Sequence, residues 1–411
     1  MIREPSVDDS VRKYLFLEVL HMTFFVGIDI AKYKHDCFIM DENGCVIRDS
    51  FSFSNDSDGF NFLLSILKDI KKKGKIKIGF ESTGHYHFNL KLALEKNGFD
   101  YIEINPLLIH KFTTTKTLRR TKTDKKDAKT IATYITTVDY KPYPNSFYHI
   151  NNLKSLYRLK ETLITDRTRF LNLITAYLDQ IFPEFKPIFN GSFNKSAFYL
   201  LTNYLTPHKM AKLDAKKYEK MKSELRNPIS YQKLCLIRDS AKNTIGNSTP
   251  ALEYSLKSTI DLYLYIDNQI EEISQKILEI YNQLDSHIHT IKGIGTLTAA
   301  GILSEIGNFD KFTTANQLLA YAGLEPSKNQ SGTLEGGGKM VKHGSSYLRK
   351  YLMNAAETFY VYNPAISDFY WKKRNENKPH RVALSHVARK LVNTIFYLEK
   401  HKVDFDVNVV K

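Results

Sequence analysis

Two short strand-like segments that each carry a carboxylate constrain the fold of this chain more than any other feature. Residues 24–30 are apolar except for Asp29, and residues 75–81 end in Glu81. Both segments have the length and composition of buried β-strands. An ionised carboxylate at the end of a buried strand costs several kcal/mol unless an opposite charge neutralises it. The sequence therefore predicts a cation beside the ends of these strands.

Two further acids, Asp124 and Asp127, lie three residues apart. On a helix this spacing puts both side chains on one side. Four carboxylates that converge make a site for Mg²⁺ or Mn²⁺, and two ions about 4 Å apart would stabilise the attacking and leaving oxygens at a phosphate. For any one acid alone the alternative is an ordinary role, in which Asp124 caps the helix and Asp127 pairs with a lysine. The four together favour the metal site.

Short strands and amphipathic helices alternate over the first third of the chain. The predicted strands are 24–30, 35–41, 46–53, 75–81 and 101–105, and the predicted helices are 58–72 and 87–97. Asn43-Gly44 predicts a tight hairpin between the second and third strands, because a type I′ turn needs positive φ at both positions. A hairpin followed by strand–helix–strand units predicts an α/β region, a mixed sheet with helical cover. The RNase H-like fold has this order.

Residues 150–288 are predicted to be helical. Apolar residues three and four apart form a seam of about three heptads, made of Tyr263, Ile266, Ile270, Ile273, Ile277, Ile280 and Leu284. The partner of this seam is either an earlier helix of the same chain or a helix of a second subunit, and both remain open. A seam between subunits would make a homo-oligomer, a dimer or a tetramer.

A third, helical region begins near residue 289. Residues 291–295 place two glycines around an isoleucine before an apolar helix that runs to Ile306. This resembles the entry of a helix-hairpin-helix, whose backbone amides can hold a phosphate, and a plain packed helix is the alternative.

A loop rich in glycine and serine follows at 323–338, with Lys339, Lys342 and Arg349 after it. Small residues allow a close approach to a sugar-phosphate backbone, and the cations supply counter-charge. Composition favours a phosphate-binding loop over a serine nucleophile, which would need a group to accept its proton. An ordinary surface loop is the third possibility.

The net charge of +15 and the pI near 9.3 predict a polyanionic partner, with nucleic acid as the leading candidate. A basic segment in the first region supplies Lys116, Arg119, Arg120 and Lys122 as candidate contacts. No uncharged apolar stretch approaches the roughly eighteen residues that a spanning helix needs, so no membrane is expected. Three cysteines without a pairing motif fit a reducing compartment, the cytoplasm.

Several motifs in order resemble the DEDD transposases of bacterial insertion sequences, the group guided by a bridge RNA. They lie at 27–32, 81–84, 123–128, 323–326, 330–332 and 342–349. The resemblance implies an RNase H-like domain of the RuvC type that holds Mg²⁺ with Asp29, Glu81, Asp124 and Asp127. It also implies a second domain with a serine nucleophile, for which Ser331 is the choice and Ser327 the alternative. DNA and a guide RNA are the implied partners.

The expected domains follow from these motifs and patterns. They are an extension at 1–22, with Met22 as a candidate start, the RuvC-like domain at 23–149, the helical coiled-coil region at 150–288, the C-terminal transposase domain at 289–400 and a tail at 401–411. Two rivals to a transposase remain. A RuvC-like nuclease that resolves DNA junctions needs the acids but not the serine, and a nucleic-acid-binding scaffold needs neither.

Overall fold

The structure is a computed structural model. It describes residues 22–81, 85–104, 106–116, 124–138, 147–325, 329–331, 334–336 and 340–407, and for some helix and strand residues it describes the backbone alone. The expected N-terminal extension lies outside these residues except for Met22. The chain divides into two compact units, Met1–Phe147 and Tyr148–Lys411. In the part of the chain that is described, no helix is long and apolar enough to cross a membrane.

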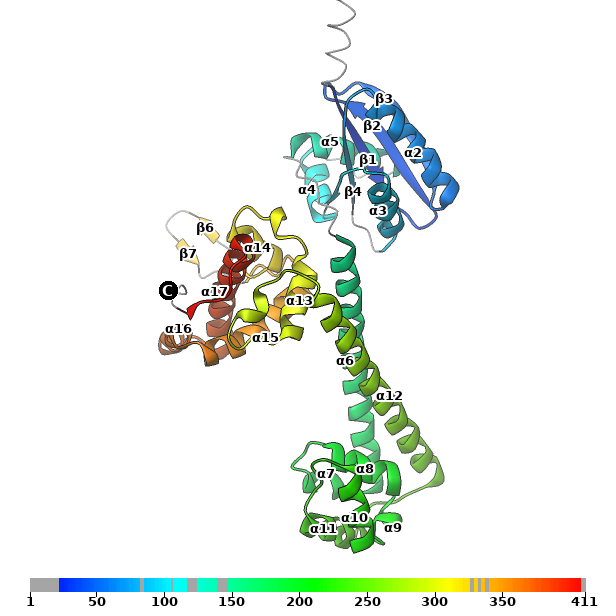
Figure 1. Cartoon of the computed structure of the whole chain (residues 1–411), viewed down its shortest axis with the longest axis vertical. Helices are drawn as coiled ribbons and strands as arrows, with labels where there is room; N and C mark the ends of the chain where they lie inside the picture. The colour runs from blue at the N-terminus through cyan, green and yellow to red at the C-terminus, as the bar shows by residue number, and fades with distance from the viewer. Residues whose placement is uncertain are drawn as a thin grey trace, which may run out of the picture. The chain divides into compact units, whose positions relative to one another are not determined.

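A five-stranded mixed sheet forms the centre of the first unit, as the sequence predicts (Figure 1). Its strands are β1 (Thr23–Asp29), β2 (Lys34–Asp41), β3 (Val46–Ser54), β4 (Lys75–Glu81) and β5 (Tyr101–Ile104). In the order β3-β2-β1-β4-β5, the first two pairings are antiparallel and the last two are parallel. The predicted antiparallel pairing of β2 with β3 is confirmed. The predicted type I′ turn is wrong, because Gly44 has a φ of 81° but Asn43 does not have a positive φ, and the amide of Gly44 donates to the carbonyl of Asp41.

Helices cover both faces of this sheet. They are α2 (Ser57–Lys71), α3 (His87–Lys96), α4 (Pro106–Lys116) and α5 (Asp124–Thr137). On one face, Leu67 of α2 and Leu90 of α3 share a hydrophobic cluster with Ile28 of β1. On the other face, Ile131 of α5 shares a cluster with Phe25 of β1, to which α4 also contributes. Odd and even positions of β1 thus face different layers, since successive strand side chains point to opposite sides.

The second unit begins with a long antiparallel helix hairpin (Figure 1). Its helices are α6 (Phe147–Ile181) and α12 (Pro250–Tyr281). Leu153, near the start of α6, clusters with Ile277, near the end of α12, while Leu178 clusters with Leu256 at the other end. The predicted seam on α12 therefore has a partner within the same chain.

The residues that connect α6 to α12 in the sequence form a small helical module. It consists of α7 (Phe185–Ile188), α8 (Lys195–Tyr204), α9 (Pro207–Met210), α10 (Ala215–Glu224) and α11 (Tyr231–Lys242). The module packs with the end of α6 and the start of α12 around one cluster, in which Phe182 and Phe185 are fully buried.

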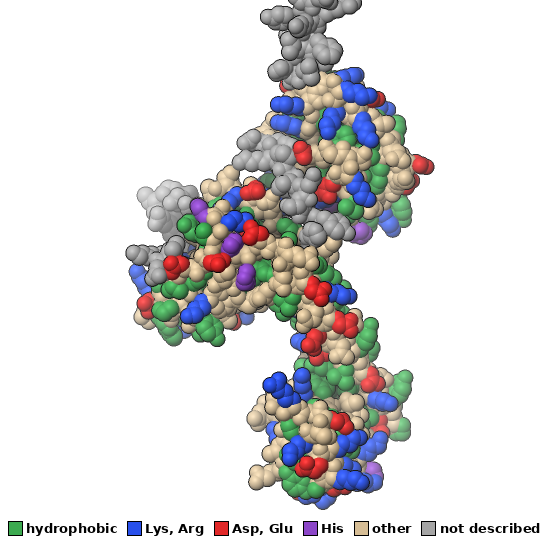
Figure 2. All heavy atoms as spheres, viewed as in Figure 1, with side chains coloured by type: hydrophobic (Ala, Val, Ile, Leu, Met, Phe, Trp, Pro, Cys, Tyr) green, Lys and Arg blue, Asp and Glu red, His purple; other side chains and the backbone are tan. Residues whose placement is uncertain are grey.

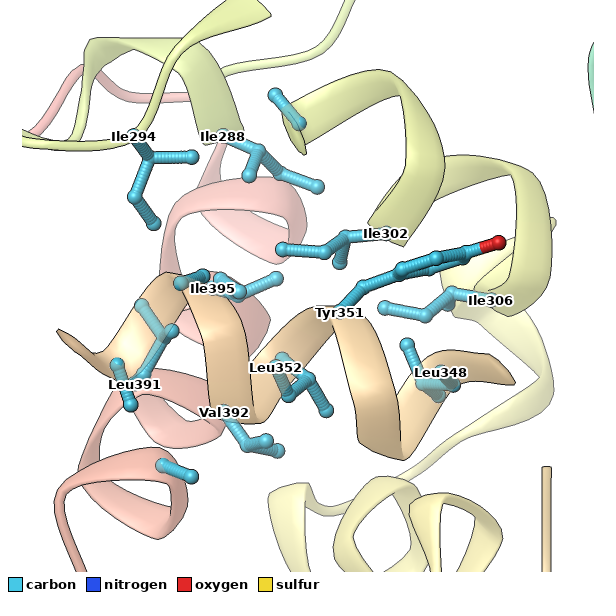
Figure 3. Packing of buried hydrophobic residues seen from close by; sticks show 14 of the residues in the cluster. Ile288, Ile294, Ile302, Ile306, Leu348, Tyr351, Leu352, Leu391, Val392 and Ile395 are labelled. Atoms are coloured by element: carbon cyan, nitrogen blue, oxygen red, sulfur yellow. The ribbon is translucent and has the colours of Figure 1, made fainter. Parts of the chain in front are cut away.

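In the rest of the second unit, the described residues form helices and one short hairpin. Its elements are η1 (Ile288–Thr290), α13 (Thr296–Ile306), η2 (Phe309–Lys311), α14 (Ala315–Ala322), β6 (Asn329–Ser331), β7 (Leu334–Gly336), α15 (Ser346–Tyr362), α16 (Pro364–Asn375) and α17 (His380–His401). Figure 3 shows Ile302 of α13, Leu352 of α15 and Ile395 of α17 packed together in its core. Gly293, in the predicted helix-hairpin-helix entry, has a φ of 93° and lies close to the carbonyl of Thr358 in α15.

Candidate active site

Helix α5 lies directly on the sheet because two glycines leave room for it. Gly27 of β1 and Gly79 of β4 are neighbours in the parallel register. A Cβ atom on Gly27 would lie 2.2 Å from the carbonyl oxygen of Ala128, and one on Gly79 would lie 2.6 Å from a methyl carbon of Ile135. A side chain at either glycine would therefore push the helix away.

The predicted acids of the two strands lie on the same face as these glycines. Asp29 and Glu81 each follow a glycine by two residues, and residues two apart in a strand point to one side. Each acid is half-buried and stands at the carboxyl end of its strand, and the two strands are parallel neighbours. Both carboxylates therefore project from one edge of the sheet toward the side that α5 covers.

The first turn of α5 supplies the other two predicted acids. Asp127 is half-buried and directly precedes Ala128, whose carbonyl lies against Gly27. Asp124 is the first residue of α5, one turn earlier, and its side chain lies outside the described residues. Ile131 and Ile135 continue the buried side of the helix, as the sequence predicts.

These positions fit a hard divalent cation by the chemistry of their oxygen donors. Among the described side chains, which do not include that of Asp124, no three His, Cys, Asp or Glu residues lie close enough to share an ion. The backbone brings Asp29, Glu81 and the first turn of α5 to one face of the sheet, and the convergence of all four carboxylates stays a prediction.

A fifth carboxylate lies beside Asp29 and was not predicted. Asp36 of β2 is the direct antiparallel partner of Asp29, so both side chains point to the same face. It is 4% exposed, and the hydroxyl of Ser52 donates a hydrogen bond of 2.5 Å to it. Asp36 could be found only from the register of the β1–β2 pair, because the residue pattern of one strand does not show which residues lie opposite each other.

The candidate nucleophile lies in the second unit. Ser331 is the last residue of β6 and pairs with Leu334 of β7, so its backbone is at the turn of a two-stranded hairpin. Its side chain, and the whole of the alternative Ser327, lie outside the described residues. The choice between the two serines therefore stays a prediction.

The predicted nucleic-acid contacts are described only in part. The side chains of Lys116, Arg119, Arg120, Lys122 and Lys339 lie outside the described residues. Lys342 is exposed. Arg349 is half-buried, and its Nη1 donates hydrogen bonds to the carbonyl oxygens of Ala322, at 3.2 Å, and Lys342, at 3.4 Å.

Comparisons with known proteins identify both halves of this arrangement. Residues 26–183 match the DEDD transposase family named for IS110, and residues 285–371 match the transposase family IS116/IS110/IS902. The chain therefore carries two stretches that are similar to transposase domains of the IS110 type. It is therefore a transposase, an enzyme of DNA recombination.

Relatives align with the transposase along almost its whole length. It is 23% identical over 390 residues to the uncharacterized protein of insertion element IS116 from Streptomyces clavuligerus, which covers 93% of this chain and 96% of that protein. It is 24% identical over 406 residues to the mini-circle putative transposase for IS117 from Streptomyces coelicolor, with 94% and 96% covered. The pilin gene-inverting protein of Moraxella bovis is 23% identical over 393 residues, with 93% and 97% covered. The prediction of a transposase is confirmed.

Proposed function

We propose that this transposase cuts and rejoins DNA through a serine–DNA intermediate, with Mg²⁺ or Mn²⁺ held by the acids of its RNase H-like, RuvC-type sheet. Ser331 is the nucleophile, and Asp29, Glu81, Asp124 and Asp127 are the metal ligands. The observation that carries the proposal is the common face that Asp29 and Glu81 share with the first turn of α5.

The pairing of Asp29 with Asp36 supports a cation at this edge. Like charges directly opposite each other on neighbouring strands destabilise a sheet. Asp36 is 4% exposed, so water screens this repulsion poorly. A divalent cation, once bound, offsets the repulsion and stabilises the charge that develops on a scissile phosphate.

The proposed reaction conserves the energy of the phosphodiester bond. The Ser331 hydroxyl loses its proton to a base and attacks phosphorus, which forms a phosphoserine ester and breaks the bond to one deoxyribose oxygen. That oxygen leaves with a proton. The hydroxyl of another strand then attacks the phosphoserine, which restores a phosphodiester and returns the proton to Ser331. No external energy source is needed for either exchange.

The partners follow from the charge and from the resemblance. On the face that Figure 2 shows, Lys and Arg side chains occur on both units. This distribution agrees with the net charge of +15 and with contacts to DNA phosphates. The pilin gene-inverting relative carries a DNA rearrangement in its name. A guide RNA would pair with target and donor DNA. Joining two DNA molecules brings two sites together, so we expect a dimer or a tetramer, acting in the cytoplasm.

The test is strand transfer on supercoiled DNA that carries the ends flanking the gene, using protein purified with its RNA. Ser331→Ala should abolish both strand transfer and the detergent-stable protein–DNA adduct, while Ser327→Ala should retain both. Asp29→Ala should abolish metal-dependent cleavage. Sequencing the RNA that co-purifies should show segments complementary to both DNA partners.

The rivals predict other results. Full cleavage by Ser331→Ala without any adduct would indicate a RuvC-like nuclease. DNA binding without cleavage, unchanged in Asp29→Ala, would indicate a scaffold. Loss of the adduct in Ser327→Ala alone would move the nucleophile to that residue.

A further inference from the structure

The loop that carries Ser331 leaves and returns through two stems that are hydrogen-bonded to each other. The outgoing stem is 321–325 and the returning stem is 340–345. The amide of Val341 donates to the carbonyl of Glu325 at 2.9 Å, and the amide of Ser345 donates to the carbonyl of Tyr321, also at 2.9 Å. The stems are therefore joined at both ends, and the β6–β7 hairpin extends from this base.

Two glycines let the stems approach. A Cβ atom on Gly344 would lie 2.4 Å from the carbonyl oxygen of Tyr321 on the other stem. Gly323 has a φ of 65°, a left-handed conformation, and a Cβ atom there would lie 2.6 Å from Nη1 of Arg349. Gly323 therefore makes room for the arginine as well as for the turn.

Arg349 connects the two stems. Its Nη1 donates to Ala322 on the outgoing stem and to Lys342 on the returning stem. Arg389 of α17 adds a third contact, because its Nε donates to the carbonyl of Leu324 at 3.0 Å. Hydrogen bonds from a charged donor are stronger than neutral ones.

The returning stem is also attached to the core of the second unit. The hydroxyl of Ser345 donates to Glu305 at 3.0 Å and accepts from the amide of Leu348, the first turn of α15. The side chain of Glu305 is 1% exposed and accepts two hydrogen bonds from Arg158 of α6. The base of the loop is thus fixed to α6, α13 and α15.

We infer that Arg349, assisted by Arg389, is a positioning residue for the serine loop: it fixes the separation of the two stems and so determines where Ser331 is presented. The inference rests on the proposed function, because the position of the loop matters for chemistry only if Ser331 is the nucleophile. It competes with the prediction that Arg349 contacts a DNA phosphate.

The two roles differ in what Arg349→Gln should change. A positioning role predicts that the rate of adduct formation falls by at least about tenfold, since small misplacements of reacting groups are costly. DNA affinity should stay within about twofold of the wild type, with an unchanged salt dependence. A phosphate contact predicts weaker DNA binding and a salt slope reduced by about one. Both are measured on full-length protein with its RNA and the flanking-end DNA.

Three further variants complete the test. Arg226→Gln removes the same charge from an exposed position in the helical module and should change neither measurement. Arg349→Lys keeps the positive charge and one donor nitrogen but lacks the guanidinium fork, so it should recover only part of the adduct rate. Gly323→Ala keeps every charge but displaces Nη1 of Arg349, so it should lower the adduct rate without lowering DNA affinity.

Each outcome decides one question. Wild-type adduct rates in both Arg349→Gln and Gly323→Ala would overturn the inference, as would a loss of DNA affinity that accounts for the slower adduct formation. An adduct that persists in Ser331→Ala would overturn the proposed function instead. Thermal unfolding of each variant identifies any that fails to fold, and Arg349→Lys then provides the deciding comparison.

Discussion

Gly27→Ala tests whether the close contact between α5 and the sheet positions the acids. The new Cβ would lie 2.2 Å from the carbonyl oxygen of Ala128 and 2.4 Å from the amide nitrogen of Ala132. Ordinary contact begins at 3.4 Å, so the separation must grow by the difference from 2.2 Å, about 1.2 Å. Backbone atoms cannot rotate aside as a side chain can. The helix must therefore shift, and Asp127 shifts with it.

The expected effect on function exceeds the effect on stability. Overpacking a core costs about 1–3 kcal/mol, which a domain of this size can tolerate. A displacement of about 1 Å in a catalytic group can cost on the order of a hundredfold in rate. We expect Gly27→Ala to fold, with a lower melting temperature, and to lose most of its Mn²⁺ affinity and DNA cleavage. Titration calorimetry with Mn²⁺, thermal unfolding and a plasmid cleavage assay measure the three quantities.

Gly44→Ala is the matched control in the same sheet. Gly44 has a φ of 81°, and no atom lies within 4 Å of the place where its Cβ would be, so alanine there adopts a left-handed conformation without touching α5. The expected cost is about 1–2 kcal/mol, with Mn²⁺ affinity unchanged. Wild-type metal affinity in Gly27→Ala, or an equal loss in Gly44→Ala, would refute the reasoning.

Three other predictions concern buried residues that can carry a charge. Asp36→Asn should raise the melting temperature without metal, because the repulsion with Asp29 is gone, and should lower Mn²⁺ affinity by about tenfold or more; unfolding with and without Mn²⁺ measures both. Glu305→Gln removes the carboxylate that pairs with Arg158, whose side chain is 46% exposed and stays solvated, so urea unfolding of the second unit should show a loss of about 1–2 kcal/mol. His35 is fully buried, and burial lowers its pKa below 6.5 more than Asn55 and Asp36 raise it. As pH falls, His35 is therefore protonated in the unfolded chain at a higher pH than in the folded protein. The free energy of unfolding should fall below about pH 6.5, by up to about 1.4 kcal/mol per pH unit. Denaturant unfolding across this pH range measures the slope, which His35→Phe should reduce.

The sheet was predictable because its signals are local. Each predicted strand matches an observed one to within a residue or two, and the Asn43-Gly44 turn alone determines that β2 and β3 pair antiparallel. The buried side of α5 was equally visible from Ile131 and Ile135. The spacing of apolar residues and the residue types of a turn can be read without knowing which distant residues come into contact.

Asp36 and the loop stems were not predictable in the same way. Asp36 faces Asp29 only through the β1–β2 register, which a segment of one strand does not specify. The contact between Tyr321 and Ser345 crosses a loop of more than twenty residues. The charge of Arg349, which predicts a phosphate contact, is visible in the sequence, whereas its carbonyl partners are not. The heptads on α12 similarly left open whether the partner was α6 or a second subunit.

Both candidate sites depend on close contact at a glycine, with a backbone carbonyl at Gly27 and Gly344 and with the side chain of Ile135 at Gly79. Gly27-Ile28-Asp29 and Gly79-Phe80-Glu81 repeat one pattern, a glycine two residues before an acid on the same face of the sheet. The glycine leaves room for α5, and the acid two residues later then faces the first turn of that helix. At the serine loop, Gly344 admits the backbone of the opposite stem in the same manner. A side chain that fills such a gap has rotamers and can yield, whereas a backbone carbonyl cannot, so these contacts fix position more tightly than apolar packing of equal area. Substitution of these glycines should therefore reduce chemistry at a smaller cost in stability than substitution of core residues such as Ile28 or Leu352.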